Sequence, residues 1–187
     1  MFAITQRLFL RPGWREDAPA LVEAIAEEAI VRNLATAPWP YSFADAESFL
    51  MRERRPHDAA CLIFLRGEGA PRLVGGIGLG RTPDCGGEPE FGYWVARPYW
   101  GRGIATEAGR ALIANARDTL RLRRLEAGHF LDNPASGRVL AKLGFRPTGV
   151  TRARFSAGRS AEAPVREFAL DLAGAQEACA EPCPMAA

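Results

Sequence analysis

Apolar and polar residues alternate at the start of the chain and then change to helical spacing. Within residues 5–11, Leu8 and Leu10 face one way and Arg7, Phe9 and Arg11 face the other, which predicts a strand. From Asp17 onward, apolar residues recur at the spacing of an amphipathic helix. Ser42, followed three residues later by Asp45, forms a weak capping box and predicts a second helix over residues 44–54.

The rest of the chain is predicted to contain six strands with two further helices between them. One helix starts near Gly101, and the other starts at Pro134, with Asn133 as its N-cap and Gly144 just past its end. The buried face of the second helix is predicted to include Ala135. The six strands cover residues 61–66, 72–79, 90–95, 122–128, 145–152 and 164–171. Hairpins around one strand–helix–strand crossover indicate an α/β domain whose sheet is mixed rather than purely parallel.

Composition places the chain among globular proteins. It has 187 residues, of which 48% are hydrophobic and 25% charged, with a formal net charge of +2. This length predicts one domain over residues 1–172, followed by a mobile tail over residues 173–187. The N-terminus lacks the cleavage site of a secretory signal, and no segment reads as a membrane span, so we expect a cytoplasmic protein. The near-even charge balance argues against a nucleic-acid partner.

Cysteine and histidine residues are too scattered to predict a metal site. The four cysteines are Cys61, Cys85, Cys179 and Cys183, and the two histidines are His57 and His129. Cys61 lies in an apolar run, where we expect it to be buried. We expect reduced thiols and no bound metal, because no set of residues has the spacing of a zinc site.

Two glycines straddle one residue where a strand passes into a helix. Gly101 and Gly103 lack a Cβ, so an anion can approach the backbone, and the N–H groups of the first helical turn have no intrahelical acceptor. Together with the helix dipole these amides predict a cradle for a diphosphate, and Arg102 adds a cation. A dinucleotide site is an alternative: Thr106 stands where its third glycine belongs, but Glu126 lies at a suitable distance along the chain to bind a ribose.

Two longer stretches carry a family resemblance. Residues 90–108, around the glycine pair, and residues 133–145, from an Asn-Pro pair onward, resemble the GNAT acetyltransferase superfamily, and more closely its ribosomal-protein alanine N-acetyltransferase branch. Residues 5–11 are similar to the start of that branch. The resemblance implies a mixed, mostly antiparallel sheet flanked by helices, with a central strand–helix–strand crossover. It also implies acetyl-CoA as the acetyl donor and a primary amine, either a protein N-terminus or a small molecule, as the acceptor.

The resemblance also implies which residues hold acetyl-CoA. The diphosphate would sit on the helix-start amides, and the pantetheine arm would pair with the backbone of the preceding strand. The donor-binding residues implied in this way are Trp94, Val95, Ala96, Gly101, Arg102, Gly103, Ile104, Ala105, Thr106 and Asn133. The superfamily loop commonly has Gln or Arg where this chain has Trp100.

Direct attack of an amine on a thioester needs a base. An α-amino group has a pKa of about 7.7 to 8, so it arrives mostly protonated at neutral pH and must lose a proton. Glu90, at the start of the strand over residues 90–95, is the candidate base, although an acidic residue at a strand start is also an ordinary surface residue. Glu107 is a poorer candidate, because acidic residues favour the first turns of any helix. A backbone N–H, that of Val95 or of its neighbour, is expected to polarise the thioester carbonyl.

The departing sulfur needs a hydrogen-bond donor or a proton. Many superfamily members use a tyrosine seven residues beyond the Asn of the second helix, but Leu140 occupies that position here. Ser136 is the remaining hydroxyl at this helix start, and the resemblance implies that it stabilises the thiolate, although it is also an ordinary first-turn residue. The missing tyrosine keeps a second hypothesis open, a non-catalytic acyl-CoA-binding module. We expect either a monomer or a homodimer.

Overall fold

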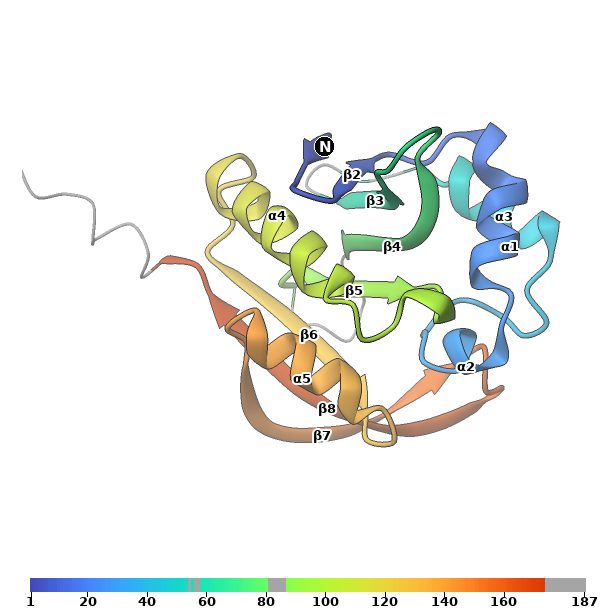
Figure 1. Ribbon diagram of the computed structural model, residues 1–187. Coiled ribbons are helices and arrows are strands. Elements are labelled where there is room, and N and C mark those ends of the chain that lie inside the picture. Colours follow the sequence, from blue (N-terminus) through green and yellow to red (C-terminus); the bar gives the residue numbers. More distant parts are fainter. Residues whose placement is uncertain (54, 56–57, 81–86, 174–187) are drawn as a thin grey trace, which may run out of the picture.

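The fold is an eight-stranded sheet with helices on both faces (Figure 1). The computed structural model describes residues 1–53, 55, 58–80 and 87–173. The strands are β1 (Ala3–Ile4), β2 (Leu8–Arg11), β3 (Ala59–Leu65), β4 (Arg72–Gly80), β5 (Glu90–Val95), β6 (Arg124–Phe130), β7 (Arg146–Ser156) and β8 (Ala161–Asp171). The helices are α1 (Ala18–Ile25), α2 (Glu28–Val31), α3 (Phe43–Met51), α4 (Ile104–Asp118) and α5 (Pro134–Lys142), with the 3-10 turns η1 (Arg15–Asp17) and η2 (Arg97–Tyr99).

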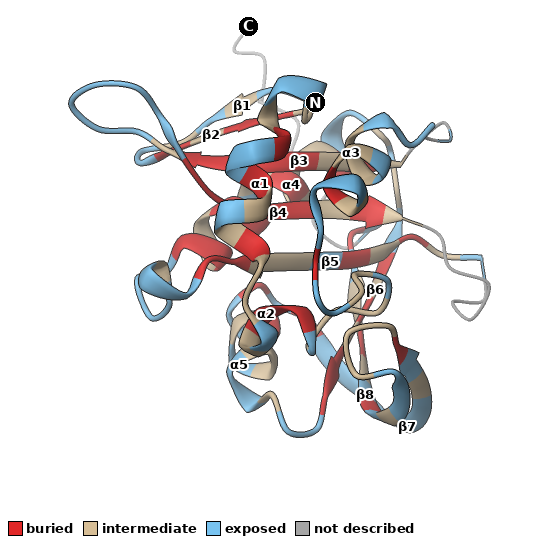
Figure 2. Ribbon diagram, turned by 90° about the vertical axis from the view of Figure 1, so that its right-hand side faces the viewer, coloured by how far each residue is buried: buried red, intermediate tan, exposed pale blue. Residues whose placement is uncertain are grey.

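The sheet order is β1-β2-β3-β4-β5-β6-β8-β7. The described strand pairs are antiparallel apart from β5 and β6, which run parallel and are connected through α4. Helices α1 and α3 pack together on one face of the sheet, and α4 and α5 cover the other face (Figures 1 and 2). This confirms the predicted fold class, a mixed and mostly antiparallel sheet with one central strand–helix–strand crossover.

Two hydrophobic clusters fill the two faces of the sheet. The larger lies under α4 and α5 and includes Leu112 and Leu140, which are almost completely buried. The other lies under α1 and α3 and includes Leu21 and Leu62. Buried residues are concentrated on the central strands, whereas β7 is largely exposed (Figure 2). Helices α1, α4 and α5 bury their apolar stripes against the sheet.

Most of the predicted elements are confirmed, with differences at their ends. The strand β5 has the predicted bounds, and the capping box of Ser42 and Asp45 begins α3 as expected. The structure adds β1 and α2, which are too short to produce a detectable hydrophobic period. Ala135 is exposed, so its predicted burial is wrong: α5 buries side chains toward its C-terminal end, at Leu140, and its first turn faces solvent.

The parallel strands β5 and β6 separate after a short shared segment. Their pairing covers Glu90 with Glu126 and Phe91 with Ala127. Beyond this point β5 continues to Val95 paired with β4. The sheet is therefore split along β5, on the side where this strand leads into α4.

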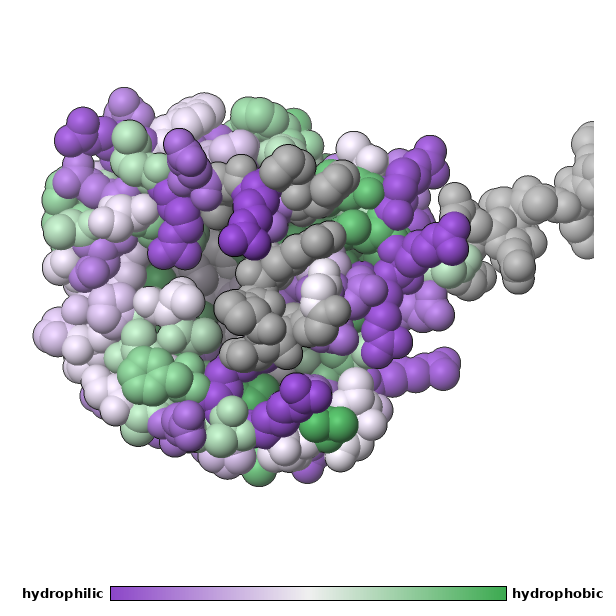
Figure 3. Space-filling view, turned by 180° about the vertical axis from the view of Figure 1, so that it is seen from behind, coloured by the Kyte–Doolittle hydropathy of each residue, from purple (hydrophilic) through white to green (hydrophobic). Residues whose placement is uncertain are grey.

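The helix lengths and the surface hydropathy give no sign of a membrane-spanning helix among the described residues. No described helix is long and apolar enough to span a membrane. Seen from behind, hydrophilic residues cover much of the described surface, and hydrophobic residues form small separate patches (Figure 3).

One of the four cysteines lies in the described part of the chain: Cys61 is buried, as predicted. Several other predictions fall on residues that the structure does not describe. The residues Cys85, Cys179, Cys183 and His57 lie outside the described residues. Of the predicted tail over residues 173–187, Ala173 alone is described, and the single-domain assignment over residues 1–172 stays a prediction.

Candidate functional site

The loop between β5 and α4 has the backbone conformation that its glycines make accessible. Gly101 and Gly103 have φ angles of 73° and 75°, in the left-handed region where a side chain costs about 1–2 kcal/mol. Gly103 is the N-cap of α4, and no side chain caps this helix, so its first amides keep their capacity to donate. Both glycines are exposed, and a Cβ on Gly101 would meet no atom within 4 Å. The loop therefore fits an anionic diphosphate lying against the backbone.

The N-terminal segment clamps this loop to the start of α4. The Glu107 carboxylate accepts hydrogen bonds from the Thr5 hydroxyl at 2.6 Å, from the Arg7 N–H at 2.9 Å and from Arg7 Nε at 2.7 Å. Arg7 Nη1 also donates to the carbonyl of Arg102 at 2.9 Å. Burial acts to raise the pKa of Glu107, but the hydrogen bonds from Thr5 and Arg7 outweigh burial and lower this pKa overall. The Glu107 carboxylate is thus engaged in holding the loop.

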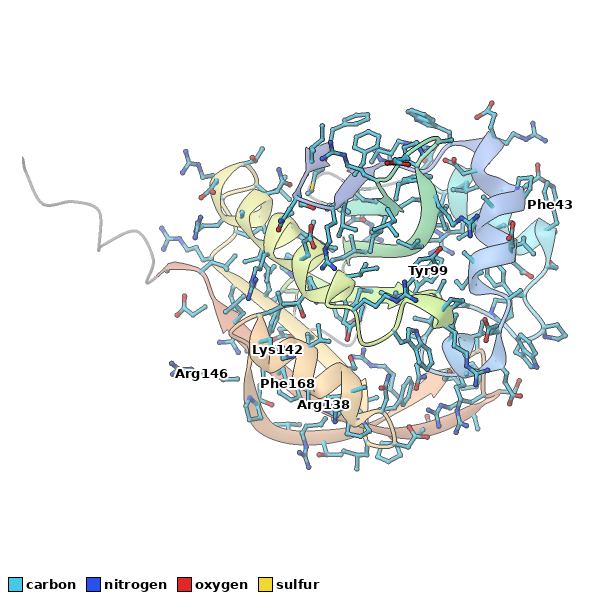
Figure 4. All side chains as sticks on the ribbon, viewed as in Figure 1. Phe43, Tyr99, Arg138, Lys142, Arg146 and Phe168 are labelled. Atoms are coloured by element: carbon cyan, nitrogen blue, oxygen red, sulfur yellow. The ribbon has the colours of Figure 1, made fainter. Side chains whose placement is uncertain are left out.

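A cavity of about 470 Å³ lies along the exposed side of α4, next to this clamp. Its lining carries three cations, Arg7, Arg110 and Lys142, against one carboxylate, that of Glu107. Lys142, the only lysine of the chain, stands at the end of α5 on the side of α4 (Figure 4). The excess of positive charge complements a ligand that carries several phosphates. Sequence reasoning missed Arg110 and Lys142, because nothing in their local pattern distinguishes them from other surface cations.

Strand β5 presents backbone groups to the gap between β5 and β6. The Ala96 N–H donates to the Val74 carbonyl on β4 at 2.8 Å. Strand alternation therefore directs the N–H and the carbonyl of Val95 away from β4 and toward the gap. The Val95 carbonyl accepts a hydrogen bond from the Trp100 indole N–H at 2.6 Å. Trp94 packs with the cluster under α1 and α3. Of the predicted pantetheine contacts on β5, the backbone groups of Val95 therefore face the gap, whereas the Ala96 N–H is bonded to β4 and Trp94 alternates toward β4 with it.

The first turn of α5 is joined to the same part of β5. Asn133 is the N-cap of α5, as predicted, and its side-chain oxygen accepts the Ser136 N–H at 3.3 Å. The Tyr93 hydroxyl donates to the Ser136 hydroxyl at 3.0 Å. Burial raises the pKa of Tyr93, and the hydrogen bond to Ser136 partly offsets this effect. Sequence reasoning missed Tyr93, because no local pattern connects it with a residue 43 positions away.

Glu90 and Ser136 lie on opposite faces of the sheet. Alternation along β5 puts Glu90 on the face of Trp94, which packs with the cluster under α1 and α3. Tyr93 packs with the cluster under α4 and α5, and its bonded partner Ser136 lies on that face. The Glu90 carboxylate forms an ion pair with Arg154 of β7, and both side chains are largely buried. The two predicted catalytic residues therefore lie on opposite faces of the sheet near the split, each with a partner of its own.

A second cavity, of about 600 Å³, lies between α2 and the loop before α5 and includes Trp100 in its lining. Asp132, beside Asn133 in this lining, accepts hydrogen bonds from Arg159 at 2.8 and 2.9 Å and from Arg32 at 3.1 Å. The hydrogen bond from Arg159 is the largest cause of the lowered pKa of Asp132. This network ties the end of α2, the loop before α5 and the turn after β7 into one wall.

An uncapped helix start beside two separating strands is an arrangement into which a long, phosphate-bearing ligand fits. Residues 7–146 match the family described as an acetyltransferase (GNAT) domain. The chain belongs to this family and is an acetyl-CoA-dependent N-acetyltransferase.

Individual relatives agree with this assignment. The uncharacterized N-acetyltransferase YoaA of Bacillus subtilis is 28% identical over 159 residues, which cover 81% of this chain and 88% of that protein. The ribosomal-protein-serine acetyltransferase of Escherichia coli is 31% identical over 96 residues, 51% of each chain. The solved structure of RimL, a ribosomal L7/L12 alpha-N-protein acetyltransferase in complex with coenzyme A, superposes with a TM-score of 0.76 at 19% identity and covers 91% of this chain and 98% of that chain. The relatives thus include ribosomal-protein acetyltransferases, consistent with the branch that the sequence resembles.

Proposed function

We propose that this enzyme acetylates a primary amine, with a protein N-terminus as the first acceptor to test and a small amine as the alternative. The names of two relatives, both ribosomal-protein acetyltransferases, support a protein acceptor. The observation that carries the proposal is that β5 and β6 separate after Phe91, with Glu90 just before this point on one face of the sheet and Ser136, bonded to Tyr93, on the other face. An amine can then approach the thioester on one face while the sulfur departs on the other. We also propose a cytoplasmic location and a monomer or homodimer.

The donor would be held by backbone groups at both ends of the split, and acetyl-CoA supplies the activated acetyl group. The helix-start amides bind the diphosphate, and the cations Arg7 and Lys142 lie beside it for the remaining phosphate. The open part of β5 pairs with the pantetheine arm, and the Asn133 amide reaches the same arm. The proposed donor-binding residues are Trp94, Val95, Ala96, Gly101, Arg102, Gly103, Ile104, Ala105, Thr106 and Asn133.

Three residues divide the chemistry in this proposal. Glu90 accepts the proton of the amine, directly or through a water, while Arg154 fixes its carboxylate and competes with an incoming ammonium group for it. The Val95 N–H donates to the thioester oxygen as negative charge develops there. Ser136 donates a hydrogen bond to the departing sulfur. The family match to acetyltransferases favours this enzymatic role over a non-catalytic acyl-CoA module or a dinucleotide site.

Thiol release from acetyl-CoA tests the proposal against a panel of N-terminal peptides, polyamines and aminoglycosides. We expect Glu90→Gln and Ser136→Ala each to lower kcat by about a hundredfold, with the dissociation constant of CoA unchanged. The exposed residues Glu68 and Ser48 provide matched controls, since Glu68→Gln and Ser48→Ala make the same chemical changes away from the split. Silence toward every amine would contradict the proposed acceptor class. Turnover that survives both site variants would contradict the proposed roles.

A further inference from the structure

A pair of hydroxyl groups bridges the split in the sheet. Tyr93 lies two residues beyond Phe91, the last residue of β5 that pairs with β6. Its ring packs beside that of Phe91 with centroids 6.0 Å apart. Its hydroxyl reaches Ser136 on α5, the helix that follows β6, at 3.0 Å. The hydrogen bond thus connects β5 with the helix that follows β6, close to the point where the two strands separate.

Ser136 is held from two directions. Its backbone N–H is fixed by the N-cap residue Asn133, whose side-chain oxygen accepts it at 3.3 Å and whose carbonyl accepts it at 3.1 Å. Its hydroxyl oxygen accepts from the Tyr93 phenol. A phenol is the more acidic of the two hydroxyls, which makes it the better donor and the serine oxygen the better acceptor. Because Ser136 accepts the hydrogen bond from Tyr93, its own hydroxyl proton can be donated to a third group. Ser136 is partly exposed, so such a group can reach it.

The phenol stays in its neutral, donating form at neutral pH. Burial raises the pKa of Tyr93 above its usual value, although the hydrogen bond to Ser136 lowers it in part. In a chain of two hydroxyls each hydrogen bond polarises the next, so donation by the phenol makes the serine proton a stronger donor. A serine that lacks this partner is both less polarised and free to rotate.

We propose that Tyr93 is a positioning residue, which orients and polarises the Ser136 hydroxyl so that its proton points to the departing sulfur of CoA. This role rests on the proposed acetyl transfer. The amine nitrogen forms a bond to the acetyl carbon, the carbon–sulfur bond breaks, and its electron pair stays on sulfur as a thiolate. The proton of the amine leaves to Glu90 or water, and the thiolate later takes a proton from solvent. Tyr93 keeps its own proton throughout.

The test compares Tyr93→Phe, Ser136→Ala and the double variant, with Tyr41→Phe as the matched control on the opposite face of the sheet. Tyr93→Phe keeps the ring and its contact with Phe91. We expect it to lower kcat by about fivefold to tenfold and Tm by only a few degrees, as for the loss of one hydrogen bond, with KM for acetyl-CoA and the dissociation constant of CoA unchanged. The double variant should be no slower than Ser136→Ala, because the tyrosine acts through the serine.

Two further measurements separate this role from a purely structural one. Ser136→Thr restores a hydroxyl, and we expect it to recover part of the rate lost in Ser136→Ala in the presence of Tyr93 but not in the Tyr93→Phe background. The kcat–pH profile should keep its shape in Tyr93→Phe, because the phenol does not titrate during turnover. In an ultraviolet titration of the three tyrosines, the component that Tyr93→Phe removes should show a higher pKa in Ser136→Ala than in the wild type, because the Ser136 hydroxyl can turn to donate to the phenolate and so favours ionisation.

Each contrary result overturns a defined part of the argument. An active enzyme in which Tyr93→Phe keeps the full kcat overturns the role of Tyr93 alone. Rate losses that multiply in the double variant show that the two hydroxyls act independently, which also overturns it. A wild-type enzyme silent toward every amine, with the pair intact in the titration, overturns the proposed function and this role with it.

Discussion

Replacing Glu107 by alanine removes the shared acceptor of the N-terminal clamp. The side chain is 18% exposed and receives hydrogen bonds from both Thr5 and Arg7. Hydrogen bonds to a charged group contribute about 1.5–3 kcal/mol each, but Arg7 is 44% exposed, so solvent screens much of its share. We therefore expect Glu107→Ala to lower the free energy of unfolding by about 2–3 kcal/mol, which for a chain of this size lowers Tm by roughly 5–10 °C.

The same change should weaken binding of CoA without removing chemistry. Arg7 also donates a hydrogen bond to the Arg102 carbonyl in the loop before α4. This loop therefore loses a stabilising contact when Glu107 no longer orients Arg7. We expect the dissociation constant of CoA, measured by calorimetry, to rise about threefold to tenfold, with kcat at saturating acetyl-CoA retained. Glu107→Gln keeps an acceptor oxygen and should show about half of the loss in stability.

The pH dependence has a definite sign. The pKa of Glu107 is lowered in the folded state, so its contribution is present above the unfolded value of 4.5 and is lost as the pH falls below it. The difference in Tm between the wild type and Glu107→Ala should therefore shrink in acid. The exposed residue Asp118 on the same helix is the control, and Asp118→Ala should leave Tm and CoA binding unchanged. Unchanged Tm and CoA affinity in Glu107→Ala would refute the clamp, and a loss of kcat alone would show that the carboxylate acts in the chemistry.

Three further variants test other parts of the structure. Gly103→Ala should weaken CoA binding about threefold to tenfold through strain at φ 75°, whereas Gly67→Ala, at an open position with ordinary φ, should not; equal effects would argue against the diphosphate cradle. Lys142→Ala should weaken binding of CoA about fivefold and binding of dephospho-CoA less; identical losses would place this lysine away from the extra phosphate. Leu112→Ala, at a fully buried position, should cost about 2–5 kcal/mol in chemical denaturation, and a loss below this range would mean that the core repacks around the cavity.

The split sheet explains why the site's parts come from distant segments. The strand β5 contributes Glu90, Tyr93 and Val95 to it, but their side chains or backbone groups point in different directions. Tyr93 is hydrogen-bonded to Ser136 of α5 on one face of the sheet, and Glu90 is paired with Arg154 of β7 on the other. A reaction in which one group enters and another leaves can use such a two-sided arrangement, because entering and departing groups need not compete for one pocket.

Local sequence determined the elements that frame the site. The run of aromatic and β-branched residues over 90–95 predicted β5 to the residue, because these side chains fit a pleated, half-buried surface. The Asn133-Pro134 pair begins α5 where an N-cap and a first-position proline predict a helix start. The positive φ angles of Gly101 and Gly103 follow from the same kind of reasoning.

Tertiary structure alone decided which side chains meet at the site. Three side-chain pairs there join residues far apart in the sequence. Thr5 donates to Glu107 over a separation of 102 residues, and Arg154 donates to Glu90 over 64. Tyr93 donates to Ser136 over 43. Hydrophobic periodicity and capping residues predict which face of a helix or strand is buried and where it ends, but not which residues from distant segments contact it. The pairing of strands and the docking of α5 fix the long-range distances, and these depend on packing of the whole sheet. The chain's pattern therefore specified the glycine loop that we propose as the phosphate site, while the fold selected the partners of the carboxylates and hydroxyls around it.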